Sequence, residues 1–199
     1  MKRLILKVTA VALLISQLLT IGGGIQDKTV SAAAGSTIQS VPVMTDNLLK
    51  YGLEKDIQLP ATVTANGFSY TLEKIMIYET KSATAQSLIK LYDYLGTEKS
   101  KYFIWTKITI KNESGNIVQQ NVKDLSDKWR FDFGEDAWSA MPDKMVKEKN
   151  STKALWDWVL LPGKQLTTYQ AFTYNGDFDF FSIRLIIKNA SNKLYIVKK

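Results

Sequence analysis

The chain has 199 residues and a formal net charge of +7, and 45% of its residues are hydrophobic, as in an ordinary globular protein. It contains no cysteine and no histidine. Disulfides, thiolate nucleophiles, zinc–cysteine sites, the Ser-His-Asp triad and imidazole metal ligands are therefore excluded. Any chemistry would have to use carboxylate, lysine, tyrosine or serine side chains, and we expect no cofactor.

The beginning of the chain predicts an export signal. Residues 1–3 are Met-Lys-Arg, residues 8–21 form an uncharged apolar run, and Ala32-Ala33-Ala34 supplies small residues for cleavage. We expect secretion, a mature protein that begins near Gly35, and no lipoprotein anchor because no cysteine follows the run. The alternative is an uncleaved leader that tethers a structural domain to the membrane, since residues 8–26 carry no charge.

We divide the chain into a signal peptide (1–34), a polar, mobile leader (35–56) and one domain (57–199). Removing residues 1–34 takes away four basic residues and one acidic residue, which lowers the net charge from +7 to +4. This mild charge favours an anionic cell-wall polymer or a membrane surface. It is too small and too dispersed to indicate nucleic acid. A polysaccharide or a protein partner remains open.

The domain begins with a predicted hairpin. Residues 57–65 and 68–79 read as strands, and Asn66-Gly67 between them is a strong hairpin-turn signal. The apolar residues of the second strand change parity near Glu73-Lys74. This change predicts a β-bulge there.

Residues 82–95 interrupt the strand pattern. Their apolar residues recur at helical spacing, Ser82 is suited to cap the start, and Gly96 is suited to end the segment. We predict one short helix inserted between strands. An extended connection is the alternative, because residues 88–95 also alternate.

The central strand is predicted at residues 102–113, with the sequence YFIWTKITIKNE. Ile108 and Ile110 share one parity, whereas Trp105 and Lys111 share the other. This alternation is typical of a strand with one face in a core and one largely in water. Polar residues follow immediately and predict a chain reversal, which favours an antiparallel sheet.

The remaining segments also read as strands. Trp129, Phe131 and Phe133 alternate with polar residues and predict a core-facing strand. Further strands are predicted at residues 154–161, 166–174, 180–187 and 194–197. Turn signals at intervals of roughly ten residues favour a sandwich or barrel. We predict an all-β fold, an immunoglobulin-like antiparallel β-sandwich.

Three short motifs carry a resemblance to a known family. They are the strand end at residues 108–112 (ITIKN), the turn Leu160-Leu161-Pro162-Gly163, and Phe172 in the strand after it. In this order, over residues 57–199, the chain resembles the telokin-like, immunoglobulin-type domains of secreted Gram-positive bacterial proteins. The resemblance implies an extracellular β-sandwich, generally without an assigned activity, and it would make the predicted helix an insertion.

Among the five tryptophans, two are predicted to contact a ligand. The alternation of their strands places Trp129, Trp156 and Trp158 in the core. Trp105 shares its parity with lysines and Trp138 follows an acidic turn, so we predict that both are exposed. Exposed aromatic side chains stack on sugars or anchor protein partners.

Acidic residues near the tryptophans raise the possibility of hydrolysis. Glycosidases need two carboxyl groups at a set separation, and Asp132, Glu135, Asp136 and Asp157 are available. Asp132 and Asp136 are the best pair, although nothing in the sequence fixes their separation. We therefore predict a secreted, non-enzymatic binding or interaction module. The alternatives are a carboxylate-dependent hydrolase of cell-wall polysaccharide and the membrane-tethered structural domain.

One further segment has the residue types of a calcium loop. Residues 175–179, Asn-Gly-Asp-Phe-Asp, carry alternating oxygen ligands. Their spacing does not match an EF-hand and no later glutamate follows at the bidentate position. Because Asn, Gly and Asp are also turn formers, a plain turn is favoured and no metal site is predicted.

Overall fold

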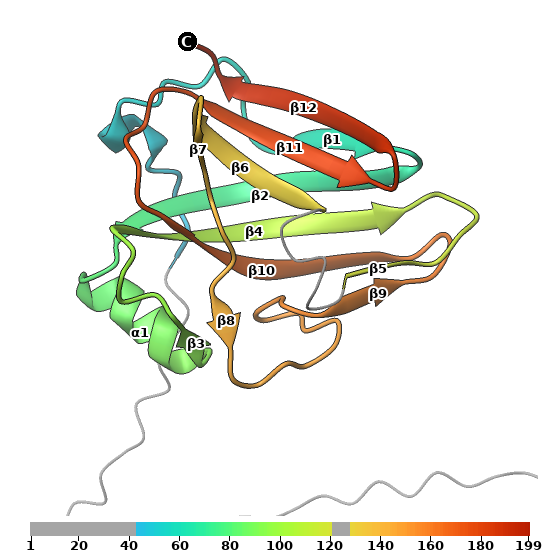
Figure 1. Cartoon of the computed structure of the whole chain (residues 1–199), viewed down its shortest axis with the longest axis horizontal. Helices are drawn as coiled ribbons and strands as arrows, with labels where there is room; N and C mark the ends of the chain where they lie inside the picture. Colours follow the sequence, from blue (N-terminus) through green and yellow to red (C-terminus); the bar gives the residue numbers. More distant parts are fainter. Residues whose placement is uncertain (1–42, 121–127) are drawn as a thin grey trace, which may run out of the picture. The chain divides into compact units, whose positions relative to one another are not determined.

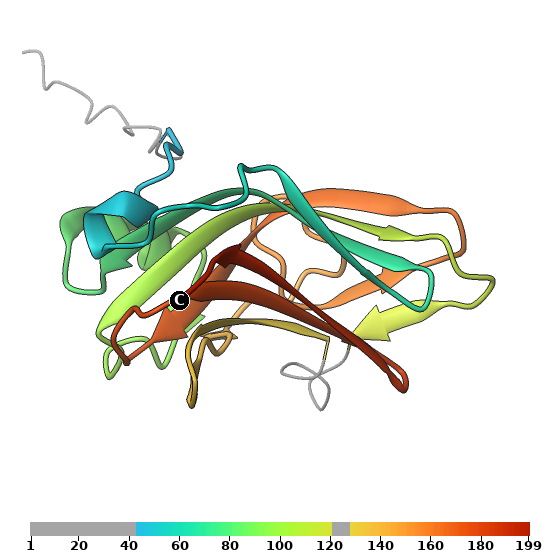
Figure 2. The same cartoon turned by 90° about the horizontal axis from the view of Figure 1, so that it is seen from above.

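A computed structural model describes residues 43–120 and 128–199, so the predicted signal peptide and its cleavage point lie outside the described residues. Two antiparallel four-stranded sheets stack face to face (Figures 1 and 2). The first sheet contains, in spatial order, β1 (Ala61–Ala65), β2 (Phe68–Glu79), β4 (Tyr102–Asn112) and β10 (Gln165–Tyr174). The second sheet contains β12 (Ala190–Val197), β11 (Phe181–Ile187), β6 (Trp129–Gly134) and β7 (Ala137–Trp138). The predicted all-β sandwich is confirmed.

Smaller elements complete the described part of the chain. They are the 3-10 helix η1 (Leu48–Tyr51), the α-helix α1 (Ala83–Leu91), the ribbon of β3 (Tyr94–Leu95) with β8 (Asp143–Lys144), and the ribbon of β5 (Val118–Gln120) with β9 (Trp158–Leu160). Helices η1 and α1 lie at the same end of the molecule (Figure 1).

The chain crosses between the two sheets three times. β1, β2 and β4 are consecutive neighbours in the first sheet; the chain then forms β6 and β7 in the second sheet. It returns to add β10 beside β4 and crosses again to form β11 and β12. β4 therefore lies between β2 and β10, as its central position in the sequence pattern predicts.

The first hairpin closes as its sequence predicts. Asn66 and Gly67 both have positive φ, 47° and 71°, which are the backbone angles of a two-residue type I′ turn. The register between β2 and β4 shifts between Leu72 and Lys74, so Glu73 is the bulged residue and the predicted β-bulge is confirmed. Because of the bulge, Ile75 and Ile77 point into the core; without it they would face outward.

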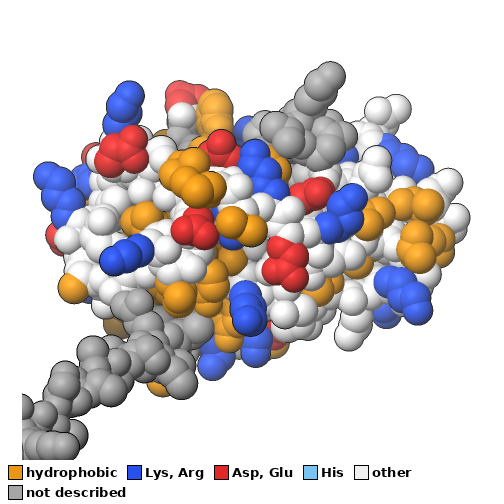
Figure 3. Space-filling view, turned by 90° about the horizontal axis from the view of Figure 1, so that it is seen from below, with side chains coloured by type: hydrophobic (Ala, Val, Ile, Leu, Met, Phe, Trp, Pro, Cys, Tyr) orange, Lys and Arg blue, Asp and Glu red, His pale blue; other side chains and the backbone are white. Residues whose placement is uncertain are grey.

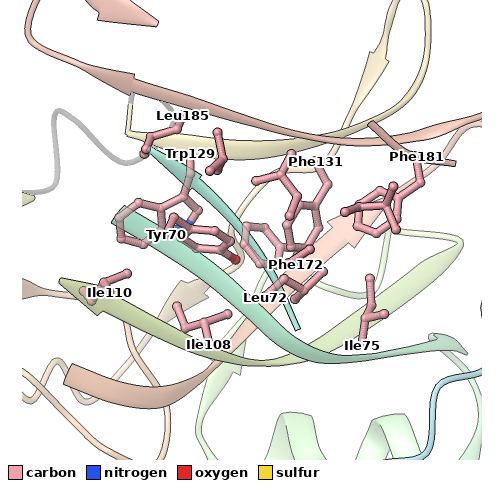
Figure 4. Close-up of a cluster of buried hydrophobic side chains, with 14 of the residues drawn as sticks. Tyr70, Leu72, Ile75, Ile108, Ile110, Trp129, Phe131, Phe172, Phe181 and Leu185 are labelled. Atoms are coloured by element: carbon pink, nitrogen blue, oxygen red, sulfur yellow. The ribbon is translucent and has the colours of Figure 1, made fainter. Parts of the chain in front are cut away.

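The core between the two sheets is rich in aromatic side chains (Figure 4). Ile108 and Ile110 are fully buried in it, on the face that the strand pattern predicts. From the second sheet, Trp129 and Phe131 point inward, and the Phe131 ring centre lies 4.5 Å from that of Phe172. The buried indole N–H of Trp129 donates to the Gln170 side chain at 2.8 Å, so its polar atom is satisfied.

Two of the three motifs that carry the family resemblance are in contact in the structure. The Asn112 side chain at the end of β4 donates to the Leu160 carbonyl at 2.9 Å, and the Gly163 backbone N–H donates to the Asn112 carbonyl at 2.7 Å. Gly163 has a φ of 73°, which favours glycine. The strand end and the turn before β10 are thus tied together, which fixes the register of β10 on β4.

The described part of the predicted leader packs on the sandwich. Leu48 in η1 and Leu53 just after it are both buried in the main core. The Asn47 side chain bonds the Ile77 backbone in both directions, accepting from its N–H at 2.8 Å and donating to its carbonyl at 2.7 Å. The packed domain therefore begins before residue 57, because the apolar residues of this segment complete the core.

The predicted inserted helix is present and is shorter than its sequence segment. Ser82 caps it, its hydroxyl accepting from the Ala85 N–H at 3.3 Å. The helix ends at Leu91 because Asp93 has a positive φ of 55° and the chain then enters β3. Ala85 and Leu88 are buried in a second hydrophobic cluster, which also contains Phe103 and Trp105 from the outward side of β4.

Candidate functional site

Trp105 is fully buried, so the prediction that it is exposed is wrong. Its side chain points away from the main core, as the alternation requires, but α1 and β3 cover that end of the first sheet. Its indole ring stacks with Tyr92 and Tyr169, whose ring centres are 5.2 and 5.6 Å away. Because the side chain is fully buried, Trp105 offers no surface to a ligand.

Trp138 has the opposite outcome. It lies on the two-residue strand β7, opposite Asp132 of β6, and it is 51% exposed. The guanidinium carbon of Arg130 lies 4.6 Å from the centre of its ring, a cation–π contact. The contact holds the indole at the surface, where an aromatic plane is open to a partner.

Around Trp138, the strand register brings polar side chains from four strands into two rows. One row runs across the second sheet from Trp138 through Asp132 and Ser182 to Tyr195. The next row contains three cations on three adjacent strands. We name this surface the cationic face; its members are Arg130, Asp132, Trp138, Ser182, Arg184, Lys193 and Tyr195.

The alternation of the strands determines which residues form the cationic face. In β6, Trp129, Phe131 and Phe133 enter the core, so Arg130 and Asp132 must point outward. β11 behaves in the same way, with its odd-numbered apolar residues inside and Ser182 and Arg184 outside. Because β6 and β11 are about fifty residues apart in sequence, only the register of the sheet reveals the cluster.

Asp132 is the centre of the cationic face and is only 4% exposed. Its carboxylate accepts from the Nε atoms of Arg130 and Arg184 at 3.0 and 3.1 Å, and Lys193 Nζ lies 3.3 Å away. Three cations therefore share one carboxylate, which leaves a net charge of +2. Beside it, the Ser182 hydroxyl is buried and has no hydrogen-bond partner among the described residues.

A pocket of about 460 Å³ continues this surface past the end of β12. It is lined by Glu135, Phe180, Lys193, Tyr195, Lys198 and Lys199. Lys193 Nζ lies over both rings, 5.0 Å from the centre of Phe180 and 4.6 Å from that of Tyr195. Hydrogen bonds to Glu135 and Asp179 raise the pKa of Lys199, which keeps its charge firmly in place. The pocket thus combines lysine ammonium groups with aromatic faces.

Of the four acidic residues that the sequence singles out, three contact different cations and the fourth, Asp136, lies in a turn. Asp132 is bound within the cationic face, and Glu135 pairs with Lys199 at 2.9 Å. Asp157 lies 4.0 Å from Lys149 before β9. Asp136 is exposed in the turn between β6 and β7 and lines a hollow of about 280 Å³ with Trp138. Trp138 thus lies beside two of the predicted acids: Asp136, its near neighbour in sequence, and Asp132, which the strand pairing places opposite it.

The oxygens of residues 175–179 are engaged separately. Asn175 Oδ1 accepts from the Lys101 N–H at 2.7 Å, and the Asp177 carbonyl accepts from the Tyr174 hydroxyl at 2.6 Å. Burial raises the pKa of Tyr174 to about 12, with Asp177 and Tyr102 adding to the effect. Within residues 43–120 and 128–199, no group of three or more acidic side chains is arranged to hold a metal ion. These residues form the connection between β10 and β11.

Other surfaces of the described chain have a mixed character. Figure 3 looks onto the side of α1, β8 and β9, where basic, acidic and hydrophobic side chains are interspersed. Exposed apolar residues in or directly after α1, β3 and β8 include Leu91, Leu95, Met145 and Val146. In the part of the chain that the structure describes, no helix is long and apolar enough to span a membrane.

Comparisons with known proteins add one structural likeness. No model of a known protein family matches the chain, and no curated protein sequence matches it significantly. Among solved structures, the yjhA protein from Bacillus subtilis is similar over 63% of this chain and 76% of its own, with 15% sequence identity and a TM-score of 0.40. The class of protein that the fold defines is an antiparallel β-sandwich with one inserted helix.

Proposed function

We propose that this chain is a secreted, non-enzymatic binding module and that the cationic face is its binding surface. The observation that carries the proposal is the register that places three cations in one row, with Trp138 and Tyr195 at the two ends of the neighbouring row. Both aromatic side chains are exposed, at 51% and 40%. Binding surfaces are typically enriched in arginine, tryptophan and tyrosine.

The proposal also includes the protein family to which the chain belongs. The chain would be a telokin-like, immunoglobulin-type domain of a secreted Gram-positive protein. The contact between the Asn112 strand end and the Leu160–Gly163 turn supports this, because it gives two of the three motifs of the resemblance a common structural role. The basic, apolar start of the sequence supports export.

The state of Asp132 supports a binding role over hydrolysis. A general acid or nucleophile must reach the reacting atoms, and a glycosidase needs a second carboxyl group at a set distance. Asp132 is buried, and both of its oxygens contact cations. It is positioned to hold Arg130 and Arg184 in place.

The test is retention on purified cell-wall polysaccharide, run together with a reducing-end release assay. Wild type should be retained and release nothing, and Trp138→Ala should lose about tenfold or more in affinity, the size expected for an exposed aromatic anchor. Leu161→Ala is the matched control, because Leu161 is also 51% exposed and lies in the turn before β10. It should bind as wild type does.

Two results would contradict the proposal. Release of reducing ends that disappears in Asp136→Asn would show a hydrolase. Equal retention of wild type and the Trp138 variant would show that binding occurs elsewhere on the chain.

A further inference from the structure

The cations of the cationic face have more binding capacity than Asp132 uses. Each guanidinium reaches Asp132 through its Nε–H, which leaves the four Nη–H donors of each arginine outside that contact. Arg130, Arg184 and Lys193 are a quarter to a third exposed, so water or a ligand can approach them. One buried carboxylate therefore positions three cations without neutralising them.

The geometry of the row favours a ligand that carries several acid groups. The three cations lie on adjacent strands, and neighbouring strands are about 4.8 Å apart, so the row extends over roughly 10 Å. The Asp132 carboxylate already occupies the point where the three cations converge, so a ligand would bind their remaining donors individually, from the solvent side. Successive acid groups along one chain would match the row.

The aromatic side chains add a second requirement. Trp138 lies at one end of the neighbouring row and Tyr195 at the other, and Tyr195 with Phe180 also lines the 460 Å³ pocket. Planar aromatic faces beside cations suit rings that have an apolar face and carry a negative charge. Acidic sugars have both properties.

We propose that the ligand of the cationic face is an acidic polysaccharide, whose carboxylate or phosphate groups bind Arg130, Arg184 and Lys193 while its sugar rings stack on Trp138 or Tyr195. This inference rests on the proposed function and names its ligand class. Positive charge in excess on one face also attracts such a polymer before contact is made. The predicted export would place the domain where extracellular polysaccharides are found.

The experiment measures binding of the full chain to four immobilised polymers. Polygalacturonate carries carboxylates on sugars, its fully methyl-esterified form has the same backbone without charge, polyphosphate has charge without sugars, and oligo-dT has phosphates and bases. We expect clear binding to polygalacturonate, weaker binding to polyphosphate, and none to the ester. Affinity for polygalacturonate should fall with salt, with a log–log slope of about −2 if three charge contacts form.

Variants identify the residues involved. Arg184→Gln and Lys193→Gln should each weaken polygalacturonate binding several-fold and make the salt slope shallower by about 0.7, the contribution of one charge contact. Lys74→Gln is the matched control, because Lys74 is an exposed lysine on β2 of the first sheet. It should change neither value. Thermal melts of each variant establish that the fold is intact.

The outcomes separate this inference from the proposed function. Equal binding of the ester and the acid, lost in Trp138→Ala, would keep a binding role for the face and overturn the acidic ligand. Preferential binding of oligo-dT would overturn the polysaccharide in favour of nucleic acid. Retention on cell-wall material without binding to either acidic polymer would also overturn the inference, whereas a wild type that is not retained on that material would remove the proposed function itself.

Discussion

Asp132 has a structural role that its sequence position conceals. Arg130, Arg184 and Lys193 are directly opposite one another on three neighbouring strands, an arrangement in which like charges repel. The Asp132 carboxylate contacts all three. Without this one acidic residue, repulsion between the three cations would destabilise the sheet.

We predict that Asp132→Asn lowers the free energy of unfolding by about 1–3 kcal/mol, somewhat less than for a fully buried pair because the cations are partly exposed. The exposed Asp136 provides the control, and Asp136→Asn should change the value by less than about 0.5 kcal/mol. Urea melts measure both. The loss in Asp132→Asn should shrink at high salt, which screens the cations from one another; a loss independent of salt would argue for a packing defect instead.

For single residues, the alternation within a strand predicts the face on which a side chain lies. It does not predict which other segments cover that side chain. The alternation of the central strand correctly places Ile108 and Ile110 in the core and turns Trp105 away from it. It does not show that α1 covers Trp105, because that helix is contributed by a different segment. The three cations around Asp132 are likewise joined by strand pairing, so no window of sequence contains the cluster.

Among the elements, the hairpin between β1 and β2 depends most directly on one residue. Gly67 has a φ of 71°, and a Cβ placed on it would lie 3.1 Å from backbone atoms of Ser114. Both the turn angle and the close approach of the neighbouring loop require glycine. This turn lies beside the end of β4, where the Glu113 N–H donates to the Gly67 carbonyl at 2.7 Å.

We expect Gly67→Ala to cost about 1–2 kcal/mol of stability, because alanine is strained at positive φ and must displace backbone. Gly115 lies in the adjacent loop and a Cβ there meets nothing within 4 Å. Gly115→Ala should therefore be neutral within about 0.5 kcal/mol. Chemical denaturation of the two variants makes the comparison; similar losses for both would mean that the loop tolerates no side chain for another reason.

Element boundaries also show what the sequence leaves open. The segment 82–95 carries both a helical and an alternating pattern, and the structure uses both, with α1 followed by β3. The choice is made by packing, because Leu88 is needed in the second cluster and Tyr94 must reach it from the other side. The sandwich itself follows from strand and turn signals, whereas its sheet order depends on crossings that no local signal specifies.

For the molecule as a whole, the stability should depend on alkaline pH in a defined direction. Tyr70 and Tyr94 are buried, and burial raises the pKa of each phenol above the ordinary value of about 10. Above that pH the unfolded chain loses these protons while the folded protein keeps them. The stability linked to both groups is therefore complete below about pH 10 and declines as pH rises further.

We predict that the free energy of unfolding falls between pH 10 and 11.5, with each buried tyrosine adding up to about 1.4 kcal/mol per pH unit. Tyr94→Phe should make this fall shallower and should cost little at pH 7, because phenylalanine keeps the ring that packs in the second cluster. Denaturant melts at a series of pH values measure it. An unchanged slope in the variant would show that Tyr94 ionises without unfolding.

The outer strands of the two sheets limit how copies of this protein can pair with one another at high concentration. β1 and β7 are short, the backbone of β12 accepts hydrogen bonds from residues 56 and 57, and β10 is bonded by the backbones of Ala140 and Leu155. Exposed strand edges invite pairing with other chains, and these edges are short or occupied. If many copies bind one polysaccharide chain, as proposed above, neighbouring copies would not pair through their strand edges. A higher density of copies would then increase avidity without causing aggregation.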